Sequence, residues 1–185
     1  SDVSPLLPQR IVREINEAID ASTIITLDAG NNRIWMSHFF KSLREGTVFC
    51  PGGIAGMGWG PPAALTAKLL YPKRPVLSVS GDGGFAMMLH VLSTAIQYDL
   101  PVVFVVMNNA GLGVIRDYQR DKIFASQFTD TDFARIAEAF GCRGIRVEQA
   151  GKLAPVIREA LKAKLPTVIE VITSQTESIF KIAPF

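Results

Sequence analysis

The sequence has little of what several large protein classes require. It contains only 2 cysteines, and Cys50 and Cys142 lack a metal-type spacing, so buried thiols are expected rather than ligands or a disulfide. No apolar run approaches the ~20 residues that span a bilayer, and no charged segment with a cleavage site opens the printed sequence. The net charge is only +2, and no basic cluster is denser than Lys73-Arg74, which gives no electrostatic basis for nucleic-acid binding. We therefore expect a cytoplasmic protein that binds neither membrane nor nucleic acid.

What the sequence does have is a regular alternation of helical and strand patterns in 185 residues of which 48% are hydrophobic. This length and composition fit one α/β domain over residues 1–185, with a linker at 1–8 and a C-terminal tail at 174–185. Strands are predicted at 23–27, 48–50, 76–80, 102–106, 143–147 and 166–172. Helices are predicted at 8–19, around Trp35, and at 57–70, 85–98, 130–140 (with Gly141 as its stop) and 153–163. The expected fold is a doubly wound, mainly parallel sheet of about six strands with helices on both faces.

Two polar clusters directly follow apolar runs of the predicted sheet. Gly81-Asp82-Gly83 follows one run, and Asn108-Asn109 follows another. Because the carboxyl ends of parallel strands share one edge, Asp82 and Asn109 can converge although 27 positions separate them. Oxygen ligands of this kind suit Mg²⁺, and adjacent glycines let backbone N–H groups approach a phosphate. Two ordinary turns would explain each cluster alone, but not their spacing with a helix-length segment between them.

This pair of clusters resembles the thiamine diphosphate (ThDP) binding motif. In that family the Asp side chain, the second Asn side chain and a backbone carbonyl two residues later bind a Mg²⁺ that bridges the diphosphate. The resemblance therefore implies Asp82, Asn109 and the carbonyl of Gly111 as metal ligands. It also implies that Gly81, Gly83 and Gly84 lie against the cofactor.

A second glycine-rich segment, residues 51–60, resembles a segment of acetolactate synthases and related enzymes. Such a run of glycines has a high entropic cost and indicates close backbone approach or positive φ angles. The resemblance implies that the Ala55 carbonyl accepts a hydrogen bond from the cofactor's 4′-amino group. It also implies that the Met57 side chain wedges between the two cofactor rings and imposes their bent arrangement. Core packing is the plainer alternative for Met57.

A third cluster, Asp28-Ala29-Gly30-Asn31-Asn32, lies between the first predicted strand and a helix. Free N–H groups and Asn side chains at a helix start can donate to phosphate, although a plain N-cap would explain Asn31 equally well. In acetolactate-synthase-type enzymes the matching loop touches the diphosphate. The resemblance thus favours Asn31 and Asn32 as cofactor contacts.

The segment after the Asn pair, residues 110–115, would close over the metal and diphosphate. We expect Leu112, Gly113 and Val114 to contact the cofactor, with Gly113 permitting close approach and Val114 forming part of an apolar wall. Tyr118 occupies the position where acetolactate synthases resembling this chain usually carry a Trp that shapes the second-substrate pocket. We expect Tyr118 to have this catalytic role, and the departure from Trp leaves the acceptor open.

The resemblance spans residues 8–172 and covers only the C-terminal, diphosphate-binding domain of an acetolactate-synthase-like enzyme. It implies decarboxylation of a small-molecule 2-oxo acid, followed by protonation or addition to a second carbonyl. It also implies a pyrimidine-binding domain, absent from this chain, that supplies an activating glutamate, and a homodimer or higher homo-oligomer. The chain is then an excised domain or a subunit of a split enzyme.

Several alternatives remain at this point. The domain could serve another ThDP-dependent lyase or decarboxylase, or be an interaction domain without cofactor. A nucleotide-binding or flavodoxin-like module would need a G-x-G-x-x-G turn or a P-loop lysine. Gly81-Asp82-Gly83-Gly84-Phe85-Ala86 lacks the last glycine of that turn, and no P-loop lysine occurs. His90, inside the predicted 85–98 helix, is expected to be structural. Arg116 and Asp117 are expected to form a solvated or interface face. The tail at 174–185 either folds over the site or is disordered.

Overall fold

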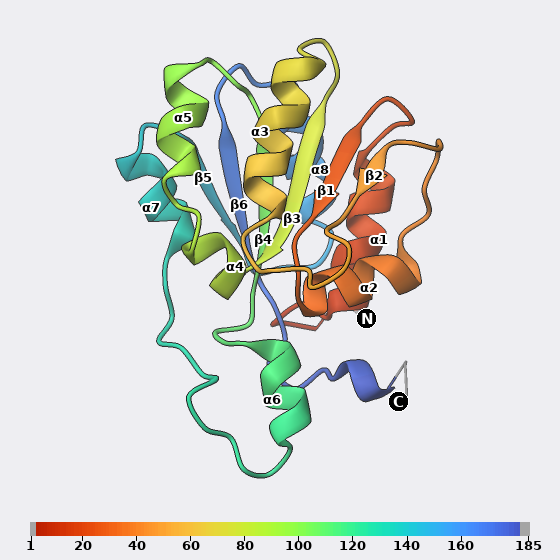
Figure 1. Ribbon diagram of the computed structural model, residues 1–185, viewed down its shortest axis with the longest axis vertical. Helices are drawn as coiled ribbons and strands as arrows, with labels where there is room; N and C mark the ends of the chain where they lie inside the picture. Colours follow the sequence, from red (N-terminus) through yellow and green to blue (C-terminus); the bar gives the residue numbers. More distant parts are fainter. Residues whose placement is uncertain (1–2, 182–185) are drawn as a thin grey trace.

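A computed structural model describes residues 3–181 and shows six parallel strands in the order β2-β1-β3-β4-β6-β5 (Figure 1). The strands are β1 (Ile24–Leu27), β2 (Val48–Phe49), β3 (Val76–Gly81), β4 (Val103–Asn108), β5 (Arg143–Val147) and β6 (Thr167–Ile172). The helices are α1 (Pro8–Ala18), α2 (Asn31–Phe39), α3 (Gly60–Leu70), α4 (Asp82–Ala86), α5 (Val91–Gln97), α6 (Gly113–Gln119), α7 (Phe133–Ala139) and α8 (Leu153–Ala160), with a 3₁₀ turn, η1, at Ile179–Lys181. The predicted α/β class and the parallel sheet are confirmed.

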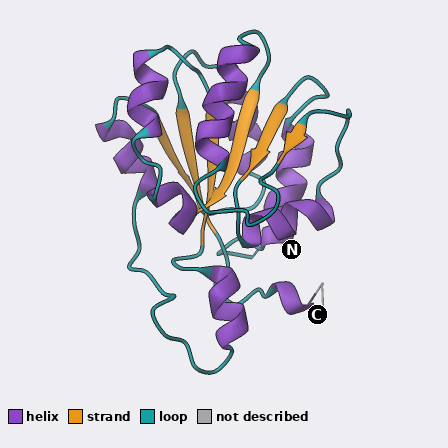
Figure 2. Ribbon diagram, in the orientation of Figure 1, coloured by secondary structure: helices purple, strands orange, loops and turns teal. Residues whose placement is uncertain are grey.

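Each face of the sheet is covered by its own apolar core, because successive strand residues point to opposite sides. One core joins α1, α2 and α8 to one face, with Ile11, Trp35 and Leu153 among its fully buried side chains. The other joins α3, α4, α5 and α7 to the opposite face and contains Phe85 and Phe104, whose rings pack at a tilt of 51°. The sheet is therefore doubly wound, as expected, with helices on both faces (Figure 2). Within residues 3–181 no helix is long and apolar enough to cross a bilayer.

The strand order places a topological switch point between β1 and β3. From β1 the chain moves outward to β2, then returns through α3 to place β3 on the other side of β1. Connections leaving the two strands in opposite directions open a crevice at the carboxyl ends, where ligands of such sheets bind. In Figure 1 this edge lies at the bottom of the sheet, facing α6 and the C-terminal segment.

Two predicted helices are shorter than the apolar pattern indicates. The predicted 85–98 helix is broken into α4 and α5 at residues 87–90. There the backbone hydrogen bonds span three residues instead of four: Met88 N–H donates to Phe85 O, and Val91 N–H donates to Met88 O. His90 is therefore the residue before α5, not a helix-interior residue as predicted. Apolar periodicity does not distinguish such tight turns from continuous α-helix. The predicted 57–70 helix begins only at Gly60.

The predicted linker and tail pair with each other in the described residues. Leu6 is fully buried, its N–H donates to Ile172 O, and its carbonyl accepts from Ser174 N–H, so it extends the sheet beside β6. Ile179 in the tail is also buried. Parts of both predictions, residues 1–2 and 182–185, lie outside the described residues. Cys142 is buried, as predicted, and burial raises its pKa to about 11. The prediction that Cys50 is buried is wrong, since it lies exposed beside the short edge strand β2.

A buried carboxylate joins the first and last long helices. Glu14 of α1 is 1% exposed and accepts hydrogen bonds from the N–H groups of Gly151, Leu153 and Ala154, at the start of α8, and from Arg10. Burial would raise the pKa of Glu14, but these donors outweigh it and hold the pKa below its ordinary value. An ionised carboxylate thus caps α8 from a neighbouring helix.

We expect Glu14→Gln to lower the free energy of unfolding by about 1–3 kcal/mol, because the amide nitrogen would face a buried N–H and leave it unsatisfied. Since folding lowers the pKa of Glu14, its contribution is present above the unfolded carboxyl pKa and is lost as the pH falls through the folded pKa. Urea unfolding at neutral and at acid pH measures this. The difference in free energy of unfolding between the unaltered chain and Glu14→Gln should shrink in acid. Glu17→Gln, which removes only an exposed pair with Arg13, is the matched control and should change stability by less than about 1 kcal/mol.

Candidate cofactor site

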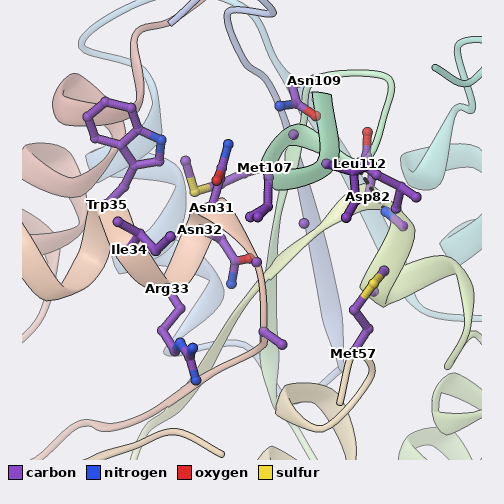
Figure 3. Close-up of a pocket in the computed structure, with 18 of the residues that line it drawn as sticks. Asn31, Asn32, Arg33, Ile34, Trp35, Met57, Asp82, Met107, Asn109 and Leu112 are labelled. Carbon is purple, nitrogen blue, oxygen red and sulfur yellow. Dashed lines mark hydrogen bonds between the residues drawn. The ribbon is translucent and has the colours of Figure 1, made fainter. Parts of the chain in front are cut away.

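The carboxyl ends of β1, β3 and β4 open onto a cavity of about 500 Å³ (Figure 3). Figure 3 shows Asp82, Leu112 and Met57 on one side of this cavity, with Asn31 and Asn32 across from them. Every residue that the sequence predicted to touch the cofactor lines it: Asn31, Asn32, Ala55, Met57, Gly81, Asp82, Gly83, Gly84, Asn109, Gly111, Leu112, Gly113 and Val114. Segments far apart in the sequence therefore form one site.

Asp82 is the first residue of α4 and its carboxylate is 4% exposed. One oxygen accepts from Gly83 N–H at 2.7 Å and the other from Gly111 N–H at 2.9 Å. Burial raises the pKa of Asp82, while these N–H groups and the positive charge of Arg116 act in the opposite direction. A bound cation would likewise favour the ionised carboxylate.

The turn after β4 brings the Asn109 amide beside the Gly111 carbonyl. The amide nitrogen donates to the Gly111 carbonyl oxygen at 2.9 Å, and the amide oxygen accepts from Arg116 Nη2 at 3.1 Å. A half-turn of the amide would bring its oxygen to the same distance from Gly111 O. In an octahedron with Mg²⁺–oxygen bonds of about 2.0–2.1 Å, adjacent ligand oxygens also lie about 2.9 Å apart, so the two groups could then share a cation.

Elsewhere the structure offers few ready metal ligands. No group of three or more His, Cys, Asp or Glu side chains that could hold a metal ion occurs in the described part of the chain. A cation at Asp82 would therefore have a single carboxylate ligand and depend on neutral oxygens and on the ligand it shares. Mg²⁺ bound with substrate phosphates is held in this way.

The glycine-rich loop, residues 51–60, is fastened by a carboxylate that the sequence analysis did not single out as functional. Asp28, fully buried after β1, accepts from the N–H groups of Gly58, Trp59 and Gly60. These bonds hold the loop at the start of α3 and explain why that helix begins at Gly60. A Cβ on Gly84 would lie within 2.1 Å of an Asp28 oxygen, so only glycine lets α4 approach this carboxylate.

Ala55 and Met57 lie in this loop and face the cavity. Ala55 has a φ of +53°, a left-handed conformation that is unusual for alanine and is found where a backbone group is specially directed. Met57 is 39% exposed, so it is not the simple core residue of the alternative interpretation. A Cβ on Gly83 would lie 3.2 Å from the Met57 methyl group and 3.0 Å from Leu112, which shows how closely these side chains close over α4.

Asn31 and Asn32 line the cavity, but their side-chain nitrogens are engaged elsewhere. Asn32 Nδ2 donates to the carbonyls of Asp28 and Val79, and Asn31 Nδ2 donates to Asp117 Oδ2 at 3.1 Å. Phosphate contacts here would therefore fall to the first backbone N–H groups of α2, which lack partners within the helix.

Tyr118 is the predicted site residue that the structure does not bring to the cavity. Its side chain is 62% exposed and packs edge-on against Phe180, with ring centroids 5.2 Å apart. Arg116 and Asp117, expected to form a solvated or interface face, are not simply solvated. Asp117 accepts from Asn31 and from the Ile179 N–H, and Arg116 Nη1 lies 3.4 Å from the Asn109 carbonyl. The described part of the tail is thus fixed beside the site, where Ser174 and Glu177 line the cavity.

The model of the family described as thiamine pyrophosphate enzyme, C-terminal TPP binding domain, matches residues 28–171. The chain belongs to this family. The chain is 36% identical over 171 residues to YdaP of Bacillus subtilis, whose name describes a thiamine pyrophosphate-containing protein. The matched region covers 91% of this chain and 30% of YdaP. The chain is 35% identical to an acetolactate synthase of the same organism, covering 93% and 31% of the two chains.

A third relative is the acetolactate synthase isozyme 3 large subunit of Escherichia coli, which is 32% identical over 161 residues, covering 84% of the TPP-binding domain and 28% of the subunit. The chain thus spans about a third of the length of the curated relatives it matches. The resemblance to ThDP enzymes seen in the sequence is confirmed at the level of the family.

Proposed function

We propose that this chain binds the diphosphate of ThDP through Mg²⁺, as the diphosphate-binding domain of a larger enzyme that acts on 2-oxo acids in the manner of acetolactate synthase. The observation that carries the proposal is the convergence of three oxygen-bearing groups at one sheet edge: the Asp82 carboxylate, the Asn109 carboxamide and the Gly111 carbonyl. Membership of the TPP-binding family supports the cofactor, and relatives named acetolactate synthase support the reaction.

Each part of the cavity has a distinct task in this proposal. Asp82, Asn109 and Gly111 would hold Mg²⁺, and the backbone N–H groups of Gly84 and Gly113 would donate to the diphosphate, since the Gly83 N–H is already bonded to Asp82. A Cβ on Gly113 would lie 2.7 Å from Asn31 Nδ2, so glycine is needed for this close approach. When bound, ThDP supplies the electron sink for loss of CO2 from a 2-oxo acid.

Part of the cavity wall is apolar and would surround the reacting rings. Met57, Leu112 and Val114 line it, and the Ala55 carbonyl would accept a hydrogen bond from the cofactor. These side chains would exclude water and separate the rings, and an apolar wall favours loss of a carboxylate charge. Their orienting effect requires a second wall that this chain does not provide.

We assign that second wall to a pyrimidine-binding domain of the same enzyme and expect a homodimer or higher homo-oligomer. Apolar side chains remain exposed around the cavity mouth, with Ile54 fully exposed and Ile115 and Phe128 more than 40% exposed. Exposed apolar groups around a ligand site are characteristic of surfaces that contact a partner.

Calorimetric titration of the chain with ThDP tests this function. We expect binding in the presence of Mg²⁺ and strong weakening on chelation of the metal. Binding of a nucleotide such as ADP with equal affinity would favour the nucleotide-binding alternative. Failure to bind ThDP with Mg²⁺ would indicate an interaction domain without cofactor.

Tyr118 provides a separate test of the acceptor pocket. Because its ring packs on Phe180 and not on the cavity wall, Tyr118→Trp should leave Mg²⁺-dependent ThDP affinity within about twofold. In the complete enzyme the substitution should act through the tail residue Phe180 and shift the ratio of products formed from competing 2-oxo acids. The expected change in discrimination is up to ~1–3 kcal/mol. Product analysis by chromatography provides the measurement, with Tyr98→Trp on the exposed end of α5 as control. An unchanged ratio would remove Tyr118 from the substrate side of the site.

A further inference from the structure

A buried carboxylate lies beneath the proposed metal site without being one of its ligands. Glu170, in β6, is fully buried. Its Oε1 accepts from Asn108 Nδ2 at 2.7 Å, and its Oε2 is 3.4 Å from the Ala134 N–H near the start of α7. Arg146 reaches Oε1 from the surface at 3.4 Å. Burying a charged group is costly unless it is well paired, so the position calls for a role that a neutral residue would not fill.

Its partner Asn108 is the last residue of β4 and the first residue of the Asn pair. The nitrogen of its amide faces acceptors: Glu170 Oε1, the Thr131 carbonyl at 3.2 Å and an Asp130 oxygen at 3.4 Å. Its oxygen accepts from the Ala110 N–H at 3.0 Å. Glu170 is the nearest of these acceptors, and together with the Thr131 carbonyl it holds the nitrogen on its own side, so that the oxygen of the Asn108 amide faces the Ala110 N–H.

The bond to Ala110 shapes the turn that carries two of the proposed metal ligands. Ala110 has a φ of +51°, an uncommon conformation for a residue with a side chain. Within this turn the Asn109 amide lies 2.9 Å from the Gly111 carbonyl oxygen and donates to it. The Gly111 N–H simultaneously donates to Asp82, so a change in the turn would displace every proposed protein ligand.

We propose that Glu170 is a positioning residue for the cation site and acts through Asn108. This inference rests on the proposed function, because it concerns the same Mg²⁺ site. Glu170 fixes the orientation of the Asn108 amide, the amide fixes the turn at Ala110, and the turn holds the Asn109 amide and the Gly111 carbonyl side by side at the proposed site. Partners that orient ligands without touching the metal commonly change metal affinity by 10–100-fold when removed.

The test measures metal affinity in the 185-residue chain by calorimetry with Mg²⁺ at fixed ThDP, and by electron paramagnetic resonance with Mn²⁺. Glu170→Gln keeps the shape but can present a nitrogen to Asn108, so we expect metal affinity about 10-fold weaker. Asn108→Asp sets two carboxylates against each other and should weaken it by up to about 100-fold. The double variant restores a donor and an acceptor in exchanged positions and should bind metal more tightly than Asn108→Asp.

Glu14→Gln is the matched control, since it alters another buried carboxylate that does not line the cavity. It should lower stability and leave metal affinity unchanged. If Asn108→Asp does not fold, Asn108→Ser, which is too short to reach Glu170, replaces it with an expected loss of about 10-fold.

The possible failures are distinguishable. Absence of Mg²⁺-dependent ThDP binding in the unaltered chain would overturn the proposed function. If the unaltered chain binds ThDP with Mg²⁺ and the Glu170 and Asn108 variants bind the metal as tightly as it does, only the positioning role is wrong. An equal loss in Glu14→Gln would likewise overturn it, because the effect would then reflect general destabilisation.

Discussion

Asp82→Ala should abolish most Mg²⁺-dependent binding of ThDP, with the apparent affinity falling at least 100-fold. The substitution removes the single carboxylate of the proposed ligand set, and carboxylate oxygen is the ligand that Mg²⁺ uses most. It also leaves the N–H groups of Gly83 and Gly111 without their acceptor, so the loop that carries Asn109 loses its contact with α4. Calorimetry with ThDP, with and without Mg²⁺, measures the loss.

Two controls separate ligand loss from loop damage. Asp82→Asn keeps an oxygen for one of the two N–H groups but lacks the charge, and should still bind ThDP weakly in Mg²⁺. Asp99→Ala removes an exposed carboxylate at the opposite end of the sheet, after α5, and should bind as the unaltered chain does. Thermal unfolding of each variant shows whether the fold is retained. Binding of ThDP with Mg²⁺ by Asp82→Ala at the unaltered affinity would refute the metal assignment.

The strands and their parallel direction, though not their order in the sheet, were predictable because buried parallel strands have a strong signature in sequence. Runs such as 102–106 are apolar throughout, and polar residues follow them where the ligand edge begins. The convergence of Asp82 and Asn109 follows from this alone, since all strands run the same way. Which loop residues touch was not predictable, because Asp28 and Glu14 bond to N–H groups that lie 30 or more positions away.

Polar residues with structural partners were the hardest to interpret from the sequence. Asn31 and Asn32 were expected to offer side-chain donors to phosphate, yet both nitrogens are engaged within the protein. The sequence presents Asn108 only as the neighbour of Asn109, although its amide nitrogen bonds to Glu170 of β6 and its amide oxygen bonds to the Ala110 N–H. Residue type gives the hydrogen-bonding capacity of a side chain, whereas its partner depends on tertiary packing.

The isolated chain plus ThDP and Mg²⁺ should turn over 2-oxo acids about 10²–10⁴-fold more slowly than the complete enzyme, because it lacks general acid–base assistance, which commonly contributes a factor of this size. The cavity is lined by two acidic side chains within the described residues, Asp82 and Glu177. Asp82 is committed to Gly83, Gly111 and the proposed cation. Burial would raise the pKa of Glu177, but bonds from Gln9 and Lys181 outweigh it and lower the pKa, so this group is a poor proton donor near neutral pH.

The missing wall adds a second loss that compounds the first. With Met57 and Ile54 exposed at the cavity mouth, water would reach the rings of a bound cofactor. The pyrimidine would be held on one side only, so its orientation would be lost as well. The assay follows pyruvate decarboxylation and acetolactate formation by the chain alone, then with the pyrimidine-binding domain added in trans, and finally by the full-length protein. Addition of that domain should restore turnover, whereas addition of a domain whose activating glutamate is replaced by Gln should not. Turnover by the chain alone at the restored rate would show that its own residues relay the proton, and would refute the composite active site.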